Sequence, residues 1–381
     1  MKNNIYWVWL AALAGPGSTL PRLLINHFGT DIEKIYNADD SEYKEAGLTP
    51  KRIATLRDKS LDLASQIVDW CNANKVKILT YEDIRYPNRL RSIPDWPAVL
   101  YYIGDLYDID NELCVATVGT RRMTKYGHDT AYSFSYDLAR AGAVVVSGLA
   151  AGIDTTCHRA ALDSGGKTIA VIGTRINKVY PSENRDIMRE IAKKCLLITE
   201  YHPFFETQAK NFPIRNRLIS GLCNAVIVFE ADKNSGSLIT ADYARKQDRR
   251  IFALPGKIGE EGSLGTNELI RDGSTMITRP LDIIQEYSNE YSLQYSDNRI
   301  FDYSPKKAKK DSFKKKQKEE IIPITDQLQK TIYGMLDTAT PVYVEQLSLP
   351  GYQYSEIITA ITMLELNGYV VSHPGNAYTK K

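Results

Sequence analysis

Six short apolar segments alternate with stretches of helical character between residues 112 and 254. Segments that are apolar along their whole length are typical of parallel strands covered on both faces. Their alternation with amphipathic helices predicts an α/β domain with a doubly wound, Rossmann-like, mainly parallel sheet. The expected strands are 113–118, 143–147, 168–172, 196–199, 225–229 and 251–254, and the expected helices are 126–140, 154–164, 182–194, 215–220 and 237–247.

A small helical N-terminal module is expected before this domain, over residues 1–75, because leucines recur there at helical spacing between glycine turns. Two short helices around Gly15-Pro-Gly17 fit a helix-hairpin-helix whose turn amides face a phosphate, and they fit a simple packing module equally well. The apolar run 5–14 has the length of a signal-peptide core. Only one lysine precedes it and a further helical pattern follows, so we place it in the module.

The expected Rossmann-like domain covers residues 80–285, and the composition changes after it. Eight lysines fall between Lys306 and Lys318, and apolar residues become rare, which predicts a disordered Lys-rich linker over 286–322. Over 323–381, three helical patterns and a turn-linked strand pair predict a winged-helix domain. Residues 325–381 hold three Lys or Arg against five Asp or Glu, which favours a protein contact over strong DNA binding.

The charge and cysteine content narrow the class of protein. A net charge of only +2 means that any nucleic-acid site must be local. The five cysteines are isolated, with no CxxC pair, so we expect no metal site, and scattered thiols fit the reducing cytoplasm. No stretch reaches the roughly 18 apolar residues of a membrane helix, so we expect no membrane contact.

Glycine-containing turns follow most of the expected strands. In a doubly wound sheet these turns meet at one edge, where backbone amides and helix N-termini bind anions. Neither GxGxxG after the first strand nor a Walker-type GxxxxGK[ST] is present, so a dinucleotide or triphosphate cofactor is not favoured. The turns are Gly119-Thr120-Arg121, Ser147-Gly148-Leu-Ala-Ala-Gly152-Ile-Asp154, Gly173-Thr-Arg175 and Ser235-Gly236-Ser237.

Arginines and an aromatic residue accompany these turns. Arg121, Arg122 and Lys125 follow the first strand, and the segment Lys210–Arg217 combines Phe212 with two arginines. Guanidinium groups bind phosphate oxygens, and an aromatic ring stacks on an unpaired base. This combination predicts a site for single-stranded DNA with little sequence preference.

The order of motifs resembles the DprA/Smf family over roughly residues 80–280. It comprises GTR at 119–121, SGLAAGID at 147–154, NFPIRNR at 211–217, SGSLITA at 235–241, PG at 255–256 and GTNELIRDG at 265–273. The resemblance implies single-stranded DNA binding and protection, a homodimer through the Rossmann domain, and loading of RecA in natural transformation and recombination. It implies no catalytic residue and no cofactor. The DNA-binding residues that it suggests are Gly119, Thr120, Arg121, Ser147, Gly148, Gly152, Asp154, Arg175, Lys210, Phe212, Arg215, Asn216, Arg217, Ser235, Gly236 and Ser237.

One position departs from the family pattern. Ala151 stands where the family usually has arginine, and Arg175 stands where glycine is usual. We therefore expect that a phosphate contact is lost at Ala151 and that Arg175 replaces it.

Two other functions stay open at this point. A nucleoside-monophosphate phosphoribohydrolase-like enzyme would need a carboxylate beside the sugar, for which Glu230 and Asp242 are the candidates. An interaction scaffold with a vestigial Rossmann site would bind no DNA through residues 80–285.

Overall fold

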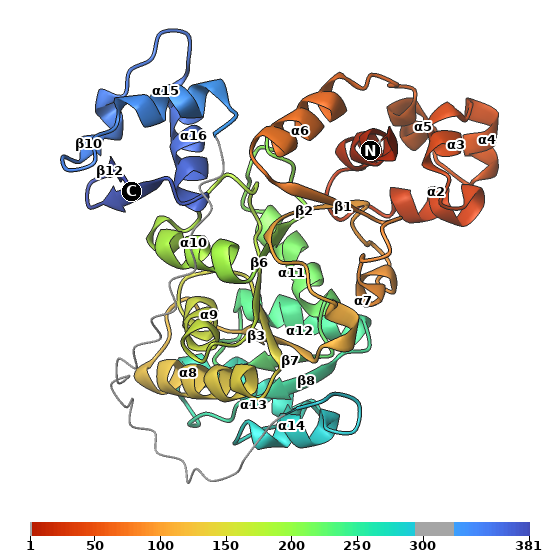
Figure 1. Cartoon of the computed structure of the whole chain (residues 1–381). Coiled ribbons are helices and arrows are strands. Elements are labelled where there is room, and N and C mark those ends of the chain that lie inside the picture. The colour runs from red at the N-terminus through yellow and green to blue at the C-terminus, as the bar shows by residue number, and fades with distance from the viewer. Residues whose placement is uncertain (1, 294–323) are drawn as a thin grey trace. The chain divides into compact units, whose positions relative to one another are not determined.

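The computed structural model describes residues 2–293 and 324–381, and the chain divides into two compact units, residues 1–295 and 296–381. The first unit contains a nine-stranded sheet in the order β1-β2-β6-β5-β4-β3-β7-β8-β9 (Figure 1). Strands β3 to β9 pair with one another in parallel, whereas β2 is antiparallel to both β1 and β6. The strands are β1 (Lys77–Thr80), β2 (Val99–Gly104), β3 (Cys114–Val118), β4 (Val144–Ser147), β5 (Thr168–Val171), β6 (Leu196–Thr199), β7 (Ala225–Val228), β8 (Arg250–Ala253) and β9 (Thr275–Met276).

The helices of the first unit cover both faces of this sheet. Figure 1 shows α8 and α9 on one side of the strands and α11 and α12 on the other. Apolar residues of α8, α9 and α14 form one core with alternate residues of the central strands. The helices are α1 (Lys2–Ala14), α2 (Leu20–Phe28), α3 (Ile32–Asn37), α4 (Asp40–Glu45), α5 (Pro50–Leu56), α6 (Asp62–Ala73), α7 (Asn88–Arg91), α8 (Lys125–Arg140), α9 (Ile153–Asp163), α10 (Arg185–Lys194), α11 (Asn211–Gly221), α12 (Gly236–Lys246), α13 (Glu261–Arg271) and α14 (Leu281–Tyr287).

The predicted doubly wound fold is confirmed. All six expected strands form, each within one residue of the expected bounds at either end. The chain visits β3, β4, β5 and β6 toward one edge and then β7, β8 and β9 toward the other, so the order reverses between β3 and β7. The carboxyl ends of these two strands therefore form the topological switch point, where such sheets usually bind ligands.

The segment before β3 contains α7 and the antiparallel strand β2, which pairs with β6 and β1. In addition, α1 packs on α6 and against β1 and β2, with Trp7 and Leu10 fully buried. The N-terminal helices are thus part of the same compact unit as the sheet.

The expected boundary at residue 285 falls inside α14. Tyr287 is buried, and Tyr291 and Leu293 pack against the core of the sheet, so the ordered chain continues beyond that boundary to 293. Most of the expected Lys-rich linker, residues 294–322, lies outside the described residues.

The second unit holds a small core of its own, built around Ile332, Ile361 and Tyr378. Its three-stranded antiparallel sheet has the order β10-β12-β11. The second of its three expected helices is instead a short strand followed by a single 3₁₀ turn, and the winged-helix assignment stays a prediction. The elements are α15 (Gln327–Met335), β10 (Val342–Tyr343), η3 (Val344–Gln346), α16 (Tyr354–Leu366), β11 (Val370–His373) and β12 (Ala377–Lys380).

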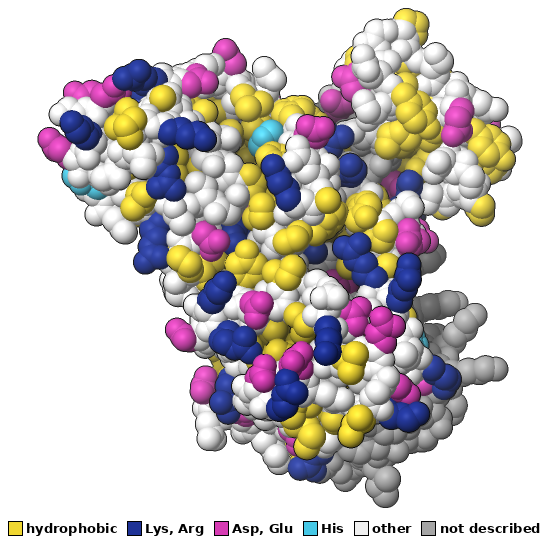
Figure 2. Space-filling view, turned by 180° about the vertical axis from the view of Figure 1, so that it is seen from behind, with side chains coloured by type: hydrophobic (Ala, Val, Ile, Leu, Met, Phe, Trp, Pro, Cys, Tyr) yellow, Lys and Arg dark blue, Asp and Glu magenta, His cyan; other side chains and the backbone are white. Residues whose placement is uncertain are grey.

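Among the helices of the described ranges, 2–293 and 324–381, none is long and apolar enough to cross a membrane. All five cysteines are buried with free thiols. On the face that Figure 2 shows, Lys and Arg side chains are interspersed with Asp and Glu, as the small net charge suggests. A DNA site must therefore be built from a few positioned groups.

Candidate nucleic-acid interface

The loop after β3 carries the exposed arginine of the site, Arg121. The amide of Thr120 donates to the carbonyl of Glu230 at 2.7 Å, and its carbonyl accepts from the amide of Ile153 at 3.2 Å. Gly119 is required because a Cβ there would lie 2.6 Å from the Ile153 side chain. Similarly, a Cβ on Gly152 would lie 2.5 Å from the Thr120 carbonyl. The loop after β3 and the loop before α9 are thus closely packed, and this packing fixes the backbone that carries Arg121.

Two aromatic rings lie beside Arg121. Its guanidinium carbon is 5.9 Å from the ring centre of Phe212, within range of a cation–π contact. The ring centre of Tyr180 lies 5.0 Å from that of Phe212, and the planes are tilted by 35°. Gly173 at the end of β5 makes room, since a Cβ there would lie 2.8 Å from the Phe212 ring. Two loops and the first turn of α11 therefore bring one cation and two rings together.

The electrostatics of this arrangement suit a single nucleic-acid strand. Arg121 is exposed, and Lys210, two residues before Phe212, is exposed as well. Tyr180 is 44% exposed and Phe212 is partly buried, so both rings are anchored while part of their surface stays accessible. A guanidinium binds a phosphate and a ring stacks on a base, which together recognise an unpaired strand.

The second expected phosphate cradle, after β4, is already occupied by a side chain of the protein. The amides of Gly148 and Ala150 donate to Oδ2 of Asp154 at 3.1 and 3.3 Å. The hydroxyl of Ser147 is buried and donates to the Thr117 carbonyl at 2.6 Å. Burial raises the pKa of Asp154, and the charge of a neighbouring arginine opposes this rise. These groups are thus hydrogen-bonded within the protein, and phosphate binding by Ser147 and Gly148 stays a prediction.

That neighbouring arginine is Arg215, and it is buried as well. Its Nη1 donates to the carbonyl of Gly148 at 2.7 Å and to the carbonyl of Val171. Only 4% of the residue is exposed, and burial lowers its pKa to about 10. Arg215 ties the ends of β4 and β5 together beneath the surface, which corrects its prediction as a groove residue.

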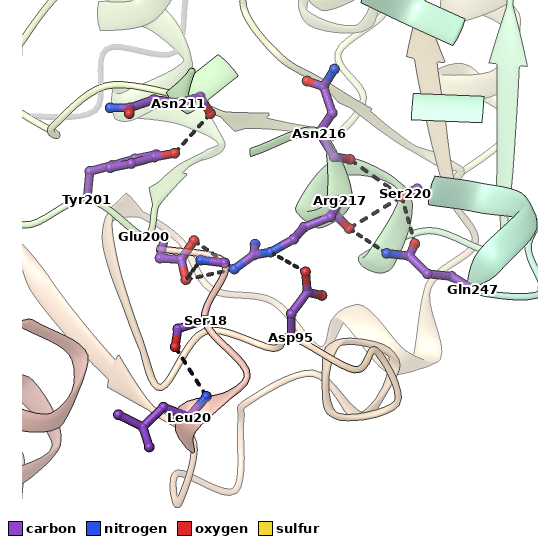
Figure 3. A network of polar contacts seen from close by, with 11 residues as sticks. Ser18, Leu20, Asp95, Glu200, Tyr201, Asn211, Asn216, Arg217, Ser220 and Gln247 are labelled. Atoms are coloured by element: carbon purple, nitrogen blue, oxygen red, sulfur yellow. Dashed lines mark hydrogen bonds and ion pairs between the residues drawn. The ribbon is translucent and has the colours of Figure 1, made fainter. Parts of the chain in front are cut away.

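Arg217 is also part of the interior. Its Nη2 bonds both carboxylate oxygens of Glu200, at 2.7 and 2.8 Å, and its Nε lies 3.2 Å from Oδ2 of Asp95. Figure 3 shows this network, in which the N-terminal turn also takes part. The amide of Gly17 donates to Oε1 of Glu200 at 3.3 Å. The turn 15–17 thus faces a carboxylate of the protein rather than a phosphate, and Arg217 is not available to DNA.

The remaining predicted residues lie around the start of α12 and in the loop after β5. Nδ2 of Asn216 donates to the carbonyl of Gly236 at 3.3 Å, which joins α11 to the first turn of α12. Ser235 caps α12 by accepting from the amide of Ser237 at 3.4 Å. Arg175 is half-buried, and Nη1 donates to the Pro203 carbonyl at 3.5 Å. Burial lowers its pKa.

The structure therefore places ten of the sixteen predicted residues in two groups. Those brought together around the exposed cation and rings are Gly119, Thr120, Arg121, Gly152 and Phe212. The buried residues that support them are Ser147, Gly148, Asp154, Arg215 and Arg217. Tyr180 was missed by the sequence reasoning, because a tyrosine in a loop has no periodic pattern that distinguishes it from packing residues.

The two carboxylates considered for catalysis have other partners. Glu230 is 5% exposed and accepts from the amide of Thr124 at 2.9 Å. Asp242 is exposed and lies 3.3 Å from Nη1 of Arg245. Neither placement favours a role as acid or base beside a bound sugar.

Comparisons with known proteins agree with this fold. The family model described as DNA recombination-mediator protein A matches residues 77–288. Protein Smf of Escherichia coli is 31% identical, over 90% of this chain and 88% of that protein. DNA processing protein DprA of Streptococcus pneumoniae is 43% identical, over 53% of this chain and 71% of that protein. The chain belongs to the DNA recombination-mediator protein A family.

Solved structures of the family have the same fold. The X-ray structure of DprA from Streptococcus pneumoniae aligns with a TM-score of 0.64 at 34% identity, covering 74% of this chain and 97% of that one. DNA processing protein A from Helicobacter pylori aligns with a TM-score of 0.52 at 34% identity, covering 57% and 99%. The description of the latter structure concerns its single-stranded DNA binding mode.

Proposed function

We propose that this chain binds single-stranded DNA with little sequence preference at the surface formed by Arg121, Phe212 and Tyr180. The observation that carries the proposal is the grouping of one exposed guanidinium and two partly accessible rings at the carboxyl ends of the strands. The single-stranded DNA binding mode of the Helicobacter pylori relative supports it.

The charged and aromatic groups of this surface contact different parts of a DNA strand. Arg121 binds a backbone phosphate, and Lys210 adds positive charge at the start of α11. A base stacks on the accessible part of Phe212 or Tyr180, which contributes roughly 1–3 kcal/mol per base. Every base has a π-face, so this contact tolerates any sequence. Bases in a duplex are already paired and stacked, so binding favours single strands.

The later steps rest on family membership. We propose that the bound strand is protected and passed to a RecA-type recombinase in the cytoplasm, and that two copies of the chain act as a homodimer. Joining two sites raises the effective affinity for one strand without any new contact. The acidic C-terminal unit, in which Glu345 and Glu356 are exposed, is proposed as a protein-contact module.

The test is a fluorescence-anisotropy titration with labelled single- and double-stranded oligonucleotides of equal length, at several salt concentrations. We expect a clear preference for single strands, which Arg121→Ala strongly reduces. Arg140→Ala is the matched control, because Arg140 is an exposed arginine at the other end of α8, about 22 Å away along the helix. Equal binding by both variants would contradict the proposal.

A further inference from the structure

Glu230 lies where the strand order of the sheet reverses. It follows β7 directly, and β7 pairs with β3, whose loop carries Arg121. In doubly wound sheets the crevice at this point usually receives the ligand, often a phosphate group. Here the Glu230 side chain occupies it and is only 5% exposed.

Two glycines on two different helices leave the space that this carboxylate fills. A Cβ on Gly127 of α8 would lie 2.0 Å from Oε2 of Glu230. A Cβ on Gly262 of α13 would lie 2.7 Å from Oε1. Both helices therefore approach Glu230 more closely than any residue other than glycine permits.

Glu230 also holds the Arg121 loop at both ends. Its carbonyl accepts from the amide of Thr120, one residue before Arg121, at 2.7 Å. Its Oε2 accepts from the amide of Thr124, the N-cap residue of α8, at 2.9 Å. A negative charge at the N-terminus of this helix is favourable. Among the described residues, no Lys or Arg side chain forms an ion pair with Glu230, and the partner of its carboxylate is the amide of Thr124.

We propose that Glu230 is the built-in anion of the switch-point crevice and the positioning residue for Arg121. Its carboxylate takes the place that a ligand phosphate takes in other sheets of this kind, and it thereby fixes the loop from which Arg121 reaches the DNA. The positioning of Arg121 for DNA rests on the proposed function, whereas the role of Glu230 as the built-in anion does not. Glu230 itself does not touch the DNA.

The test uses Glu230→Ala and Glu230→Gln in the full chain, with sodium formate as a small substitute carboxylate and sodium chloride at the same ionic strength as control. Formate should raise the thermal midpoint of Glu230→Ala by several degrees relative to chloride, and should leave the wild type and Glu190→Ala unchanged. Glu190 is a matched choice because it pairs with exposed cations on α10 and α9. Equal midpoints in formate and chloride would overturn the built-in anion.

Single-strand affinity tests the positioning role. We expect Glu230→Ala to bind single strands about tenfold more weakly than the wild type, and formate to restore part of this loss. In the Arg121→Ala background, adding Glu230→Ala should weaken binding no further. Wild-type affinity in Glu230→Ala, or additive losses in the double variant, would overturn positioning. If Glu230→Ala does not fold, Glu230→Gln keeps the side-chain volume and should still weaken binding. A wild type that binds no single strand would remove the proposed function, while the formate-dependent midpoint would still decide whether Glu230 is the built-in anion.

Discussion

The guanidinium of Arg121 lies over the ring of Phe212, although Arg121 is in the loop after β3 and Phe212 is in the first turn of α11, with β4, β5 and β6 between them in the chain. The pair makes two separable contributions to binding. Phe212→Ala should weaken single-strand binding by roughly 1–3 kcal/mol without changing its salt dependence, because stacking releases no counterions. Arg121→Ala should weaken binding and reduce the salt slope by about 0.7.

These slopes come from anisotropy titrations of both variants between low and moderate salt. Phe212→Leu is the control, because it retains an apolar side chain but no ring. A salt slope that changes with Phe212 and not with Arg121 would contradict this assignment of roles.

The turn at 15–17 offers a pair of glycines that separates backbone strain from packing. Both Gly15 and Gly17 have positive φ, 72° and 71°. A Cβ on Gly15 meets nothing within 4 Å, whereas one on Gly17 would lie 2.9 Å from the Ile214 side chain on α11. Gly15→Ala should lower the free energy of unfolding by roughly 1–2 kcal/mol from backbone strain alone. Gly17→Ala should cost about 1–3 kcal/mol more. Urea unfolding measures the free energy of unfolding of both variants. Equal losses would show that a side chain at residue 17 does not clash with α11.

The ion pair between Arg217 and Glu200 should matter far more than the exposed pairs. Arg217→Met leaves the buried Glu200 carboxylate without its main partner, and breaking such a pair costs about 3–5 kcal/mol. The control is Arg250→Met, which breaks the exposed pair with Glu286 and should cost less than about 1 kcal/mol. Chemical denaturation compares the two variants. A loss at Arg217 no larger than that at Arg250 would show that water solvates Glu200.

A buried histidine should make stability depend on pH. His158 is fully buried, and its Nδ1 lies 2.7 Å from Oγ1 of Thr168. The Thr168 hydroxyl donates to the Val145 carbonyl, so the Nδ1–H of His158 is the donor to it. Burial lowers the pKa of His158 to about 3. As pH falls below about 6.5, the unfolded chain binds a proton that the folded protein refuses, so the free energy of unfolding decreases.

The contribution of neutral His158 to the free energy of unfolding is fully present above about pH 6.5. Below that value it falls by up to about 1.4 kcal/mol per pH unit. Comparison of the wild type with His158→Gln isolates it. The buried carboxylates of Asp154 and Glu200, whose pKa values burial raises, act in the opposite direction but are common to both proteins. The difference between the two stabilities should therefore shrink from pH 7 to pH 5. A difference that is independent of pH would show that the folded protein protonates His158 as readily as the unfolded chain does.

Restoring an arginine at Ala151 should increase affinity. Ala151 is partly exposed in the loop that contacts the backbone of Thr120 and Arg121 through Gly152. Ala151→Arg adds a cation there and should steepen the salt slope by about 0.7. Arg175→Ala should weaken binding in the wild type and have a smaller effect in the Ala151→Arg variant, because one guanidinium then replaces the other. If Arg175→Ala leaves single-strand affinity unchanged, the compensation is absent.

The sequence predicted the sheet well because buried parallel strands carry a local signal. Ala225-Val-Ile-Val228 is apolar at every position and Val144-Val-Val-Ser147 at all but the last, and the structure buries all of these residues. The antiparallel β2 was missed since it follows directly on a proline-rich segment and belongs to no βα repeat. The helical start of α11 at Asn211 was also missed, because Pro213 reads as a helix breaker although it lies in the first turn.

The site was harder to predict than the fold, for a physical reason. Arginines in a glycine-rich loop have the same composition whether they face DNA or the interior. Arg121 is exposed, whereas Arg215 and Arg217 are buried against carbonyls and a carboxylate contributed by distant segments. Only the tertiary arrangement decides between these uses, since Glu200 and Gly148 lie far from them in sequence.

The contact of Gly17 with Glu200 bears on where the chain can be shortened to give a fragment. The part that the family model matches begins at residue 77, yet the carboxylate that pairs with Arg217 is covered by an amide from the preceding helices. A fragment starting there would present a hydrated carboxylate and an uncovered α11 to solvent. The segment that the family model matches and the compact unit 1–295 are thus different lengths of the same chain, and the helix that carries Phe212 belongs to both.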